Sequence, residues 1–129
     1  MHSFKVITSI IVLLAVIIGA SIFSSRILAS SSEKLQQQIS EIERNTSEGN
    51  WEKAEESITS VEKDWEKLEK TWAKLIDHME IDQIDNTLSR LTKYIETQDK
   101  PLALAEAAAL KKYIEHIPEK ESLQLKNLF

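Results

Sequence analysis

Residues 51–79 read WEKAEESITSVEKDWEKLEKTWAKLIDHM and carry the most regular hydrophobic pattern in the chain. Apolar residues recur there at alternating steps of three and four over four heptads: Trp51, Ala54, Ile58, Val61, Trp65, Leu68, Trp72, Leu75 and Met79. This spacing places all of them on one face of an α-helix and leaves the charged residues on the other face. The pattern predicts a long amphipathic helix from about Trp51 to His78.

Three tryptophans, Trp51, Trp65 and Trp72, lie on this apolar face. One interpretation is an aromatic platform that faces a partner, a ligand or a glycan. The other is a core, because a buried indole adds a large apolar area to a small domain and its place on the face needs no ligand to explain it. We favour the core.

The segments on either side of this helix have helical periodicity too. Upstream, Leu35, Ile39 and Ile42 predict a first helix, either separate from the N-terminal apolar segment or continuous with it, which a glycine-containing turn at residues 45–50 ends. Downstream, a third helix is predicted, with Asp82 as its candidate cap. Its apolar face is formed by Ile81, Ile84, Leu88, Leu91 and Ile95.

A break at residues 97–101 precedes a fourth predicted helix, from about Pro101 to His116. Its apolar face consists of Ala103, Ala107, Leu110, Ile114 and Ile117, and the alanines allow another helix to approach closely. We expect Pro118 to end this helix, since proline cannot donate the backbone hydrogen bond. The apolar tail residues Leu123, Leu125, Leu128 and Phe129 are expected to form a short helix or a strap packed on the bundle.

The composition agrees with an all-α fold. The 129 residues include only two glycines and two prolines, and good helix formers dominate the rest. Roughly a hundred residues outside an N-terminal membrane segment suffice for one domain. The prediction is a transmembrane helix followed by a four-helix bundle or by two stacked helical hairpins. Cysteine is absent from the chain, which excludes disulfides and thiolate chemistry.

The N-terminus carries 18 uncharged residues, Val6–Phe23, between Lys5 and Arg26, and two serines extend this stretch to residue 25. About 20 apolar residues span a bilayer core as a helix. A cleaved signal peptide is the alternative, but its apolar stretch is usually shorter. We therefore expect residues 1–26 to be a tail and retained anchor that contacts membrane lipid through residues 6–25. Residues 27–129 are expected to form an extracytoplasmic domain on a single-pass protein of the cell membrane.

The charge of the remaining chain disfavours nucleic acid as a partner. Residues 27–129 contain 14 Lys and Arg against 21 Asp and Glu, a net charge of about −7. A phosphate-binding surface needs the opposite sign. We predict no nucleic-acid partner.

His78 and His116 are the weak candidates for a metal or pH-sensing site. If each closes a helix of an alternating bundle, both lie at the same end, near Glu80 and Glu119. Histidines near helix C-termini also interact favourably with the helix dipole, and no metal-ligand spacing such as HExxH is present. We therefore expect no metal, no cofactor and no catalytic residues, and hence no enzyme.

A faint internal repeat links the starts of the second and fourth helices. Gly49-Asn50-Trp51 with Ala54 is followed about fifty residues later by Asp99-Lys100-Pro101 with Ala105. The first element also looks like part of a tetratricopeptide hairpin, although the rest of that signature is missing. Two stacked helical hairpins are consistent with such a repeat.

Several elements together resemble a family of short single-pass membrane proteins of Gram-positive bacteria, catalogued as domain of unknown function 4363. They are the N-terminal apolar segment, Gly49-Asn50-Trp51 with Ala54, Trp65 and Trp72, residues 78–82 (HMEID), and Asn127-Leu128-Phe129. The resemblance implies an anchored helical domain and brings no activity with it. It also makes a larger polytopic membrane protein worth considering as a partner.

Two functions are compatible with these features. The first is a membrane-anchored interaction or structural module that docks on itself or on another membrane protein. The second is an envelope sensor or ligand-binding domain that uses the acidic cluster around His78 and His116.

Overall fold

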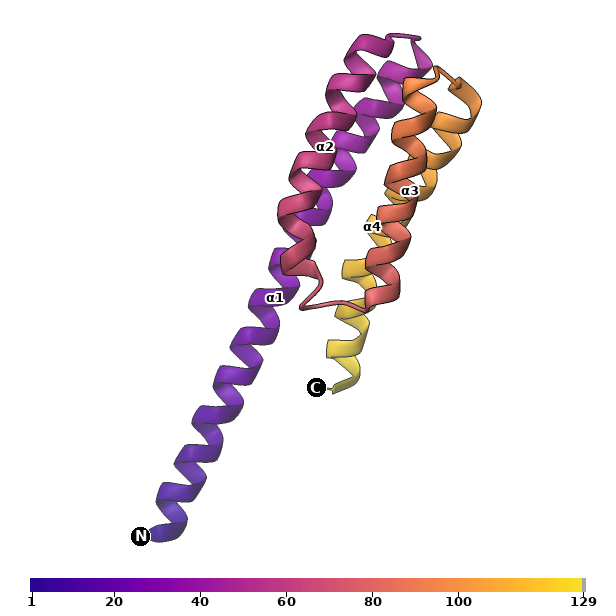
Figure 1. Ribbon diagram of the computed structural model, residues 1–129. Helices are drawn as coiled ribbons and strands as arrows, with labels where there is room; N and C mark the ends of the chain where they lie inside the picture. The colour runs from indigo at the N-terminus through magenta and orange to yellow at the C-terminus, as the bar shows by residue number, and fades with distance from the viewer. Residues whose placement is uncertain (129) are drawn as a thin grey trace.

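The computed structural model describes residues 1–128, with side chains for residues 1–120. It consists of α1 (His2–Ser47), α2 (Trp51–Trp72), α3 (His78–Glu96) and α4 (Lys100–Leu128), and the described residues contain no strand. Successive helices run in opposite directions and form a bundle, from which the first half of α1 projects alone (Figure 1). The predicted all-α fold, with a long apolar N-terminal helix ahead of a helical bundle, is confirmed.

The 46 residues of α1 form one uninterrupted helix, roughly 69 Å long at 1.5 Å per residue. The helix contains a stretch of 18 residues that is apolar enough to cross a membrane, and the protein buries none of this stretch. Burial begins at Leu28 and then follows helical spacing through Leu35, Ile39 and Ile42. The predicted boundary between residues 26 and 27 therefore lies inside a continuous helix.

The turn between α1 and α2 is built by two capping devices. Gly49 has a φ of +70°, and Asn50 donates its backbone N–H to the carbonyl of Asn45 at 2.9 Å, which closes the end of α1. The side chain of Asn50 then accepts a hydrogen bond from the N–H of Lys53 at the start of α2. The predicted glycine-containing turn is thus present.

The end of α2 differs from the prediction. The helix stops at Trp72, and Asp77 caps α3 by accepting a hydrogen bond from the N–H of Met79 at 3.1 Å. His78 therefore opens α3 rather than closing α2, and the cap is Asp77 rather than Asp82. Met79 is 77% exposed, whereas Ile76 in the turn is buried, because the helical spacing does not continue through the turn.

Pro118 does not end α4, which continues to Leu128. Proline has no N–H, so the carbonyl of Ile114 one turn earlier lacks its usual partner. The buried hydroxyl of Ser32 on α1 donates to that carbonyl at 2.8 Å instead. The side chains of the tail residues Leu123, Leu125, Leu128 and Phe129 lie outside the described part of the chain, so their predicted packing stays a prediction.

The two hairpins, α1–α2 and α3–α4, repeat each other with a spacing of 49 residues. Asn50 and Asp99 cap equivalent helices, and the buried Ala54 corresponds to Ala103 rather than to Ala105 as the sequence suggested. Equivalent buried pairs are Leu35 and Ile84, Ile39 and Leu88, Ile42 and Leu91, Ile58 and Ala107, Val61 and Leu110, and Trp65 and Ile114. The faint repeat in the sequence therefore corresponds to a duplicated pattern of burial.

The helices close into a ring in which each packs on two neighbours. The α1–α4 interface is the most extensive and the α2–α3 interface the least extensive. Two small residues on α4, Ala103 and Ala107, are fully buried in the core. On α2, the rings of Trp65 and Trp72 lie 5.4 Å apart in an edge-to-face arrangement. Both rings are buried, and Trp51 is half-buried against the core.

Candidate functional site

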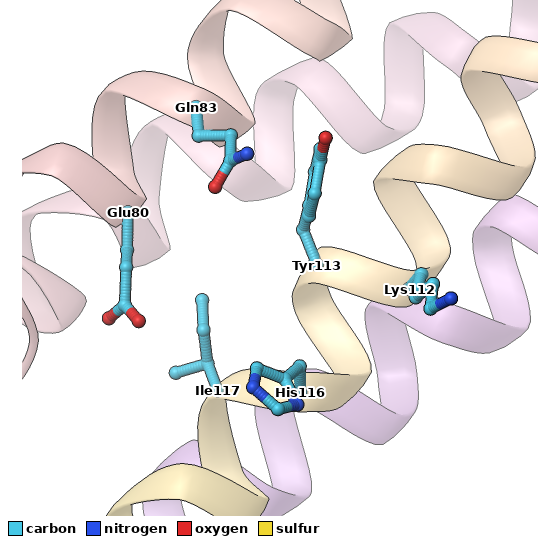
Figure 2. A pocket seen from close by; sticks show the side chains of 6 residues that line it. All are labelled: Glu80, Gln83, Lys112, Tyr113, His116 and Ile117. Carbon is cyan, nitrogen blue, oxygen red and sulfur yellow. The ribbon is translucent and has the colours of Figure 1, made fainter.

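An open groove lies between α3 and α4, toward the end of the bundle from which α1 projects. It has a volume of about 250 Å³ and is lined by Glu80, Gln83, Lys112, Tyr113, His116 and Ile117. Figure 2 shows Glu80 and Gln83 on α3 across the opening from Tyr113 and Ile117 on α4. Its lining is largely apolar, with polar groups at the edges.

The polar edge of the groove is already partly paired. Lys120 approaches Glu80 with an Nζ to Oε1 distance of 3.0 Å, and His116 is exposed to solvent. Such a site can hold a small molecule with an apolar body and a polar end. The nucleophile and base pairing that acyl transfer would need is not formed by these six lining residues.

The two candidate histidines lie at the same end of the bundle but not in one site. His116 lines the groove, whereas His78, exposed at the start of α3, does not. In the described part of the chain, no three His, Asp or Glu side chains gather closely enough to hold a metal ion. The prediction that both histidines lie at one end of the bundle agrees with the structure. Its reason was wrong, because His78 begins α3 instead of closing α2.

A carboxyl pair that sequence reasoning missed lies between α2 and α3. Asp85 accepts a hydrogen bond from the indole Nε1 of Trp65 at 2.7 Å. A hydrogen bond to Asp85, together with partial burial and the nearby charges of Asp82 and Glu66, raises the pKa of Glu69. The signal for this pair was the proximity of both acids to apolar-face positions, Glu69 beside Leu68 and Asp85 beside Ile84.

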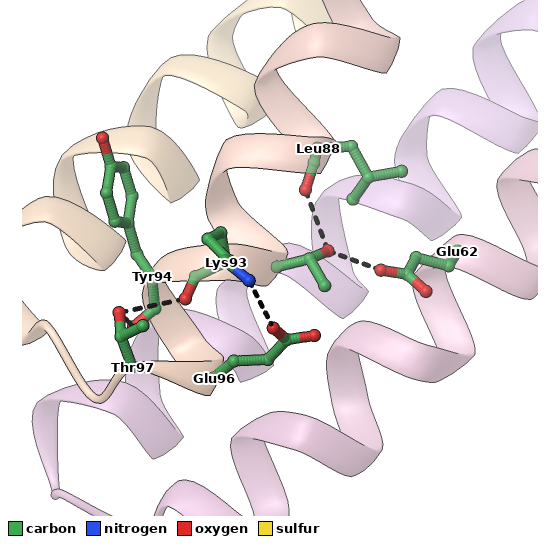
Figure 3. Close-up of polar contacts among 7 residues, drawn as sticks. Glu62, Leu88, Lys93, Tyr94, Glu96 and Thr97 are labelled. Carbon is green, nitrogen blue, oxygen red and sulfur yellow. Dashed lines mark hydrogen bonds and ion pairs between the residues drawn. The ribbon is translucent and has the colours of Figure 1, made fainter.

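A second groove of about 340 Å³ lies further along the same α2–α3 interface. It is lined by Glu55, Ile58, Thr59, Glu62, Thr92, Ile95 and Glu96. The hydroxyl of Thr92 lies within hydrogen-bond distance of two acceptors, a carboxylate oxygen of Glu62 on α2 and the carbonyl of Leu88 on its own helix, and it can donate its one proton to either. Figure 3 shows these two acceptors, Glu62 and Leu88, on either side of it. In the same view Lys93 pairs with Glu96 at 3.5 Å, so two acids of this groove, Glu62 and Glu96, have partners within the bundle.

Two serines that sequence reasoning missed lie where the projecting part of α1 enters the bundle, Ser31 half-buried and Ser32 buried. Ser31 accepts a hydrogen bond from the indole Nε1 of Trp72 at 2.9 Å, and Ser32 supports the carbonyl of Ile114. Ser32 lies four residues after Leu28 and three before Leu35, so its helical spacing was an available signal for burial.

Comparison with known proteins places the chain in a family. No curated protein and no solved structure matches it. A family model described as domain of unknown function (DUF4363) matches residues 22–128, which include the last turn of the apolar stretch and all four bundle helices. With most of its length matched by this model, the chain belongs to the DUF4363 family.

Proposed function

We propose that this protein is a non-catalytic interaction or structural module anchored in the cell membrane by residues 6–25, with its bundle outside the cytoplasm. The observation that carries the proposal is the continuity of α1. One helix joins an apolar stretch that no part of the protein buries to a segment whose apolar residues form the core of the bundle. A core helix of a soluble domain would bury that stretch.

The proposed anchoring is tested by membrane extraction. We expect the full-length chain to stay with membranes through high-salt and carbonate washes, and a chain that begins at Arg26 to be soluble and folded, because it keeps the core residue Leu28. Recovery of the full-length chain in the medium, shortened by 21 or 29 residues, would identify the apolar stretch as a cleaved signal peptide instead.

The partner we propose is a membrane protein, either a polytopic one or a second copy of this chain. A continuous helix holds the bundle close to the bilayer, which favours contacts with molecules that share the membrane surface. The test is a photo-crosslinking side chain at Lys112 on the α3–α4 groove and, as the matched control, at Thr59 on the α2–α3 groove. We expect one product of defined mass from one face in intact cells. A product of twice the chain mass identifies self-association, and equal yields from both faces contradict specific docking.

A second candidate function is ligand or metal sensing, and the groove containing His116 and Glu80 is the observation that favours it. A sensor of this kind would show Zn²⁺-dependent stabilisation or a pH midpoint near neutrality, lost in a His78→Ala, His116→Ala double variant. We expect neither response, because the two histidines do not face one site. A Zn²⁺ shift of the melting temperature that disappears in the double variant would favour the sensor over the interaction module.

A further inference from the structure

Beyond α1 and the Met1 that precedes it, large apolar side chains are exposed at two places among the side chains that the structure describes. Met79, in the first turn of α3, is 77% exposed, and Leu102, in the first turn of α4, is 46% exposed. These two residues lie at opposite ends of the bundle. Met79 is at the end from which α1 projects, and Leu102 is at the far end, where Lys100 binds the carbonyl of Ser47. Single exposed apolar side chains are common on protein surfaces, so the position of Met79 relative to the apolar stretch of α1 has to decide what it contacts.

The height of Met79 relative to the apolar stretch follows from one hydrogen bond. Trp72, the last residue of α2, donates its indole Nε1 to Ser31, so the end of α2 is level with that part of α1. Ser31 lies six residues beyond Ser25, about 9 Å along the helix. The headgroup layer extends about 5–7 Å beyond the hydrocarbon core on each side. The turn that follows Trp72 continues toward this layer.

The end of α4 reaches further in the same direction. Its register against α1 is set where Ser32 binds the carbonyl of Ile114, and α4 continues for 14 residues after that point, a distance of roughly 21 Å along a helix. Figure 1 shows the C-terminal end of α4 beyond the α2–α3 turn, alongside the projecting part of α1. Two separate segments of the bundle therefore extend toward the level of the apolar stretch.

We propose that this end of the bundle forms a second lipid contact, in which Met79 inserts into the headgroup region while α1 spans the bilayer. The inference rests on the proposed anchoring of residues 6–25. His78 precedes Met79 in the chain, Lys74 lies in the turn before α3, and both are exposed, so Lys74 offers a cation for lipid phosphates at this end, where Asp82 is exposed as well. The carboxylate of Asp77 is turned toward the N-terminus of α3, where it caps the N–H of Met79. The contact would hold the bundle upright on the bilayer.

The experiment uses the absence of native cysteine. Full-length Met79→Cys, Leu102→Cys and Ile11→Cys proteins, each carrying one environment-sensitive fluorophore, are reconstituted in phosphatidylcholine vesicles. A nitroxide is placed on the lipid headgroup in one set and near the end of the acyl chain in another. We expect the Met79 position to lose about half of its fluorescence to the headgroup nitroxide and the Leu102 position less than about a tenth, because the bundle length separates them. Quenching at Ile11 by the deep nitroxide is the internal check.

The outcomes separate the two proposals. Deep quenching at Ile11 without quenching at Met79 would overturn the second lipid contact and leave the anchor standing. Absence of deep quenching at Ile11 would overturn both. Equal quenching at Met79 and Leu102 would show the bundle lying flat on the bilayer and would contradict the end-on contact.

Discussion

Trp72 joins α2 to α1 near the end of the bundle from which α1 projects. Its ring is fully buried, packs edge-to-face on Trp65, and donates a hydrogen bond to Ser31. We expect Trp72→Ala to lower the free energy of unfolding by about 3–5 kcal/mol, the usual cost of deleting a buried aromatic ring.

The matched control for Trp72 is Lys67→Ala, an exposed position on the same helix, where the change should stay below about 0.5 kcal/mol. Chemical denaturation measures both values. Similar losses at the two positions would contradict a core role for the ring. Trp72→Phe separates packing from hydrogen bonding, since it keeps most of the apolar area and loses about 1 kcal/mol with the bond to Ser31.

Glu69 predicts a pH dependence of stability with a definite sign. Its pKa in the folded protein is raised above the ordinary value of 4.5, mainly by the hydrogen bond to Asp85. The folded state therefore holds this proton more tightly than the unfolded state, and the stabilisation is lost as the pH rises from about 4.5 through the raised pKa. Glu69→Gln removes this loss, so it should be more stable than the parent at pH 7, by about 0.5 kcal/mol.

Thermal melts between pH 4 and pH 8 check the prediction for Glu69, with Glu56→Gln as the control at an exposed position of the same helix. The difference between Glu69→Gln and the parent should grow with pH, whereas the control should follow the parent. If the stability difference between Glu69→Gln and the parent is the same at every pH, the pair of Glu69 and Asp85 is not the cause of the pH dependence.

At the scale of the element, Pro118 and Ser32 act together: the proline leaves the carbonyl of Ile114 without a backbone donor, and Ser32 supplies one. In the parent, Ser32→Ala leaves the buried carbonyl of Ile114 without a donor, which should cost about 1–3 kcal/mol. In a Pro118→Ala background the restored N–H of residue 118 supplies that donor. The same Ser32→Ala change should then cost about 1 kcal/mol less. Denaturant unfolding of the four proteins measures the coupling, and strictly additive effects would contradict the compensation.

The two hairpin turns offer a second test at this scale, because they use the same backbone geometry with different residues. Gly49 and Gln98 both have positive φ, +70° and +57°, and both follow a helix closed by the same pair of backbone hydrogen bonds. A non-glycine residue in this conformation lowers the stability of the folded state by about 1–2 kcal/mol. Glycine avoids that cost, but its greater conformational entropy in the unfolded chain offsets about 0.4–1 kcal/mol of the gain.

Gln98→Gly should therefore raise the melting temperature, and Gly49→Ala should lower it. A Cβ at Gly49 would meet only the Nζ of Lys100, at 3.9 Å, so the expected loss comes from the backbone conformation rather than from a clash. Opposite signs at the two turns are the expected result of differential scanning calorimetry. The same sign at both would show that φ is not the cause.

For the whole molecule, the proposed location of the bundle outside the cytoplasm is open to direct measurement. Because the chain has no cysteine, Thr59→Cys creates a single exposed thiol on α2. We expect a membrane-impermeant maleimide to label it in intact cells, as the proposed extracytoplasmic location requires. Labelling only after permeabilisation would place the bundle in the cytoplasm, and a His2→Cys variant at the N-terminal tail should show the opposite pattern in either case.

The arrangement of the four helices also explains why the interfaces differ although the hairpins repeat. The α1–α4 and α2–α3 contacts occupy equivalent places in the duplicated pattern. On α4, which forms the more extensive contact, the core residues Ala103 and Ala107 are small, whereas the α2–α3 contact contains the Trp65 indole and the acids Glu69 and Asp85. Small side chains permit close approach, and bulk together with like charge keeps helices apart. The α2–α3 side is therefore the more open one.

Local sequence information was sufficient to predict the four helices, their apolar faces and the long apolar N-terminal stretch. The helical spacing of apolar residues, the capping residues and the helix propensities all act over a few residues of the chain. Positions such as Ile39, Ile58, Leu91 and Leu110 could therefore be assigned to a core without knowing which helix covers them. The predicted end of α2 at His78 was wrong because an unbroken spacing concealed the turn that Asp77 caps.

Contacts between residues distant in the sequence decided the remainder. The helix α4 continues past Pro118 because the hydroxyl of Ser32, 86 residues earlier in the chain, donates to the carbonyl of Ile114, which the proline cannot serve. Asp85 and Glu69 become a carboxyl pair only when α2 and α3 pack together. His116 and Glu80 likewise share a groove because α3 and α4 lie side by side, which places His78 outside it. Hydrogen bonds and charges depend on distances in space, and those distances follow from packing rather than from spacing along the chain.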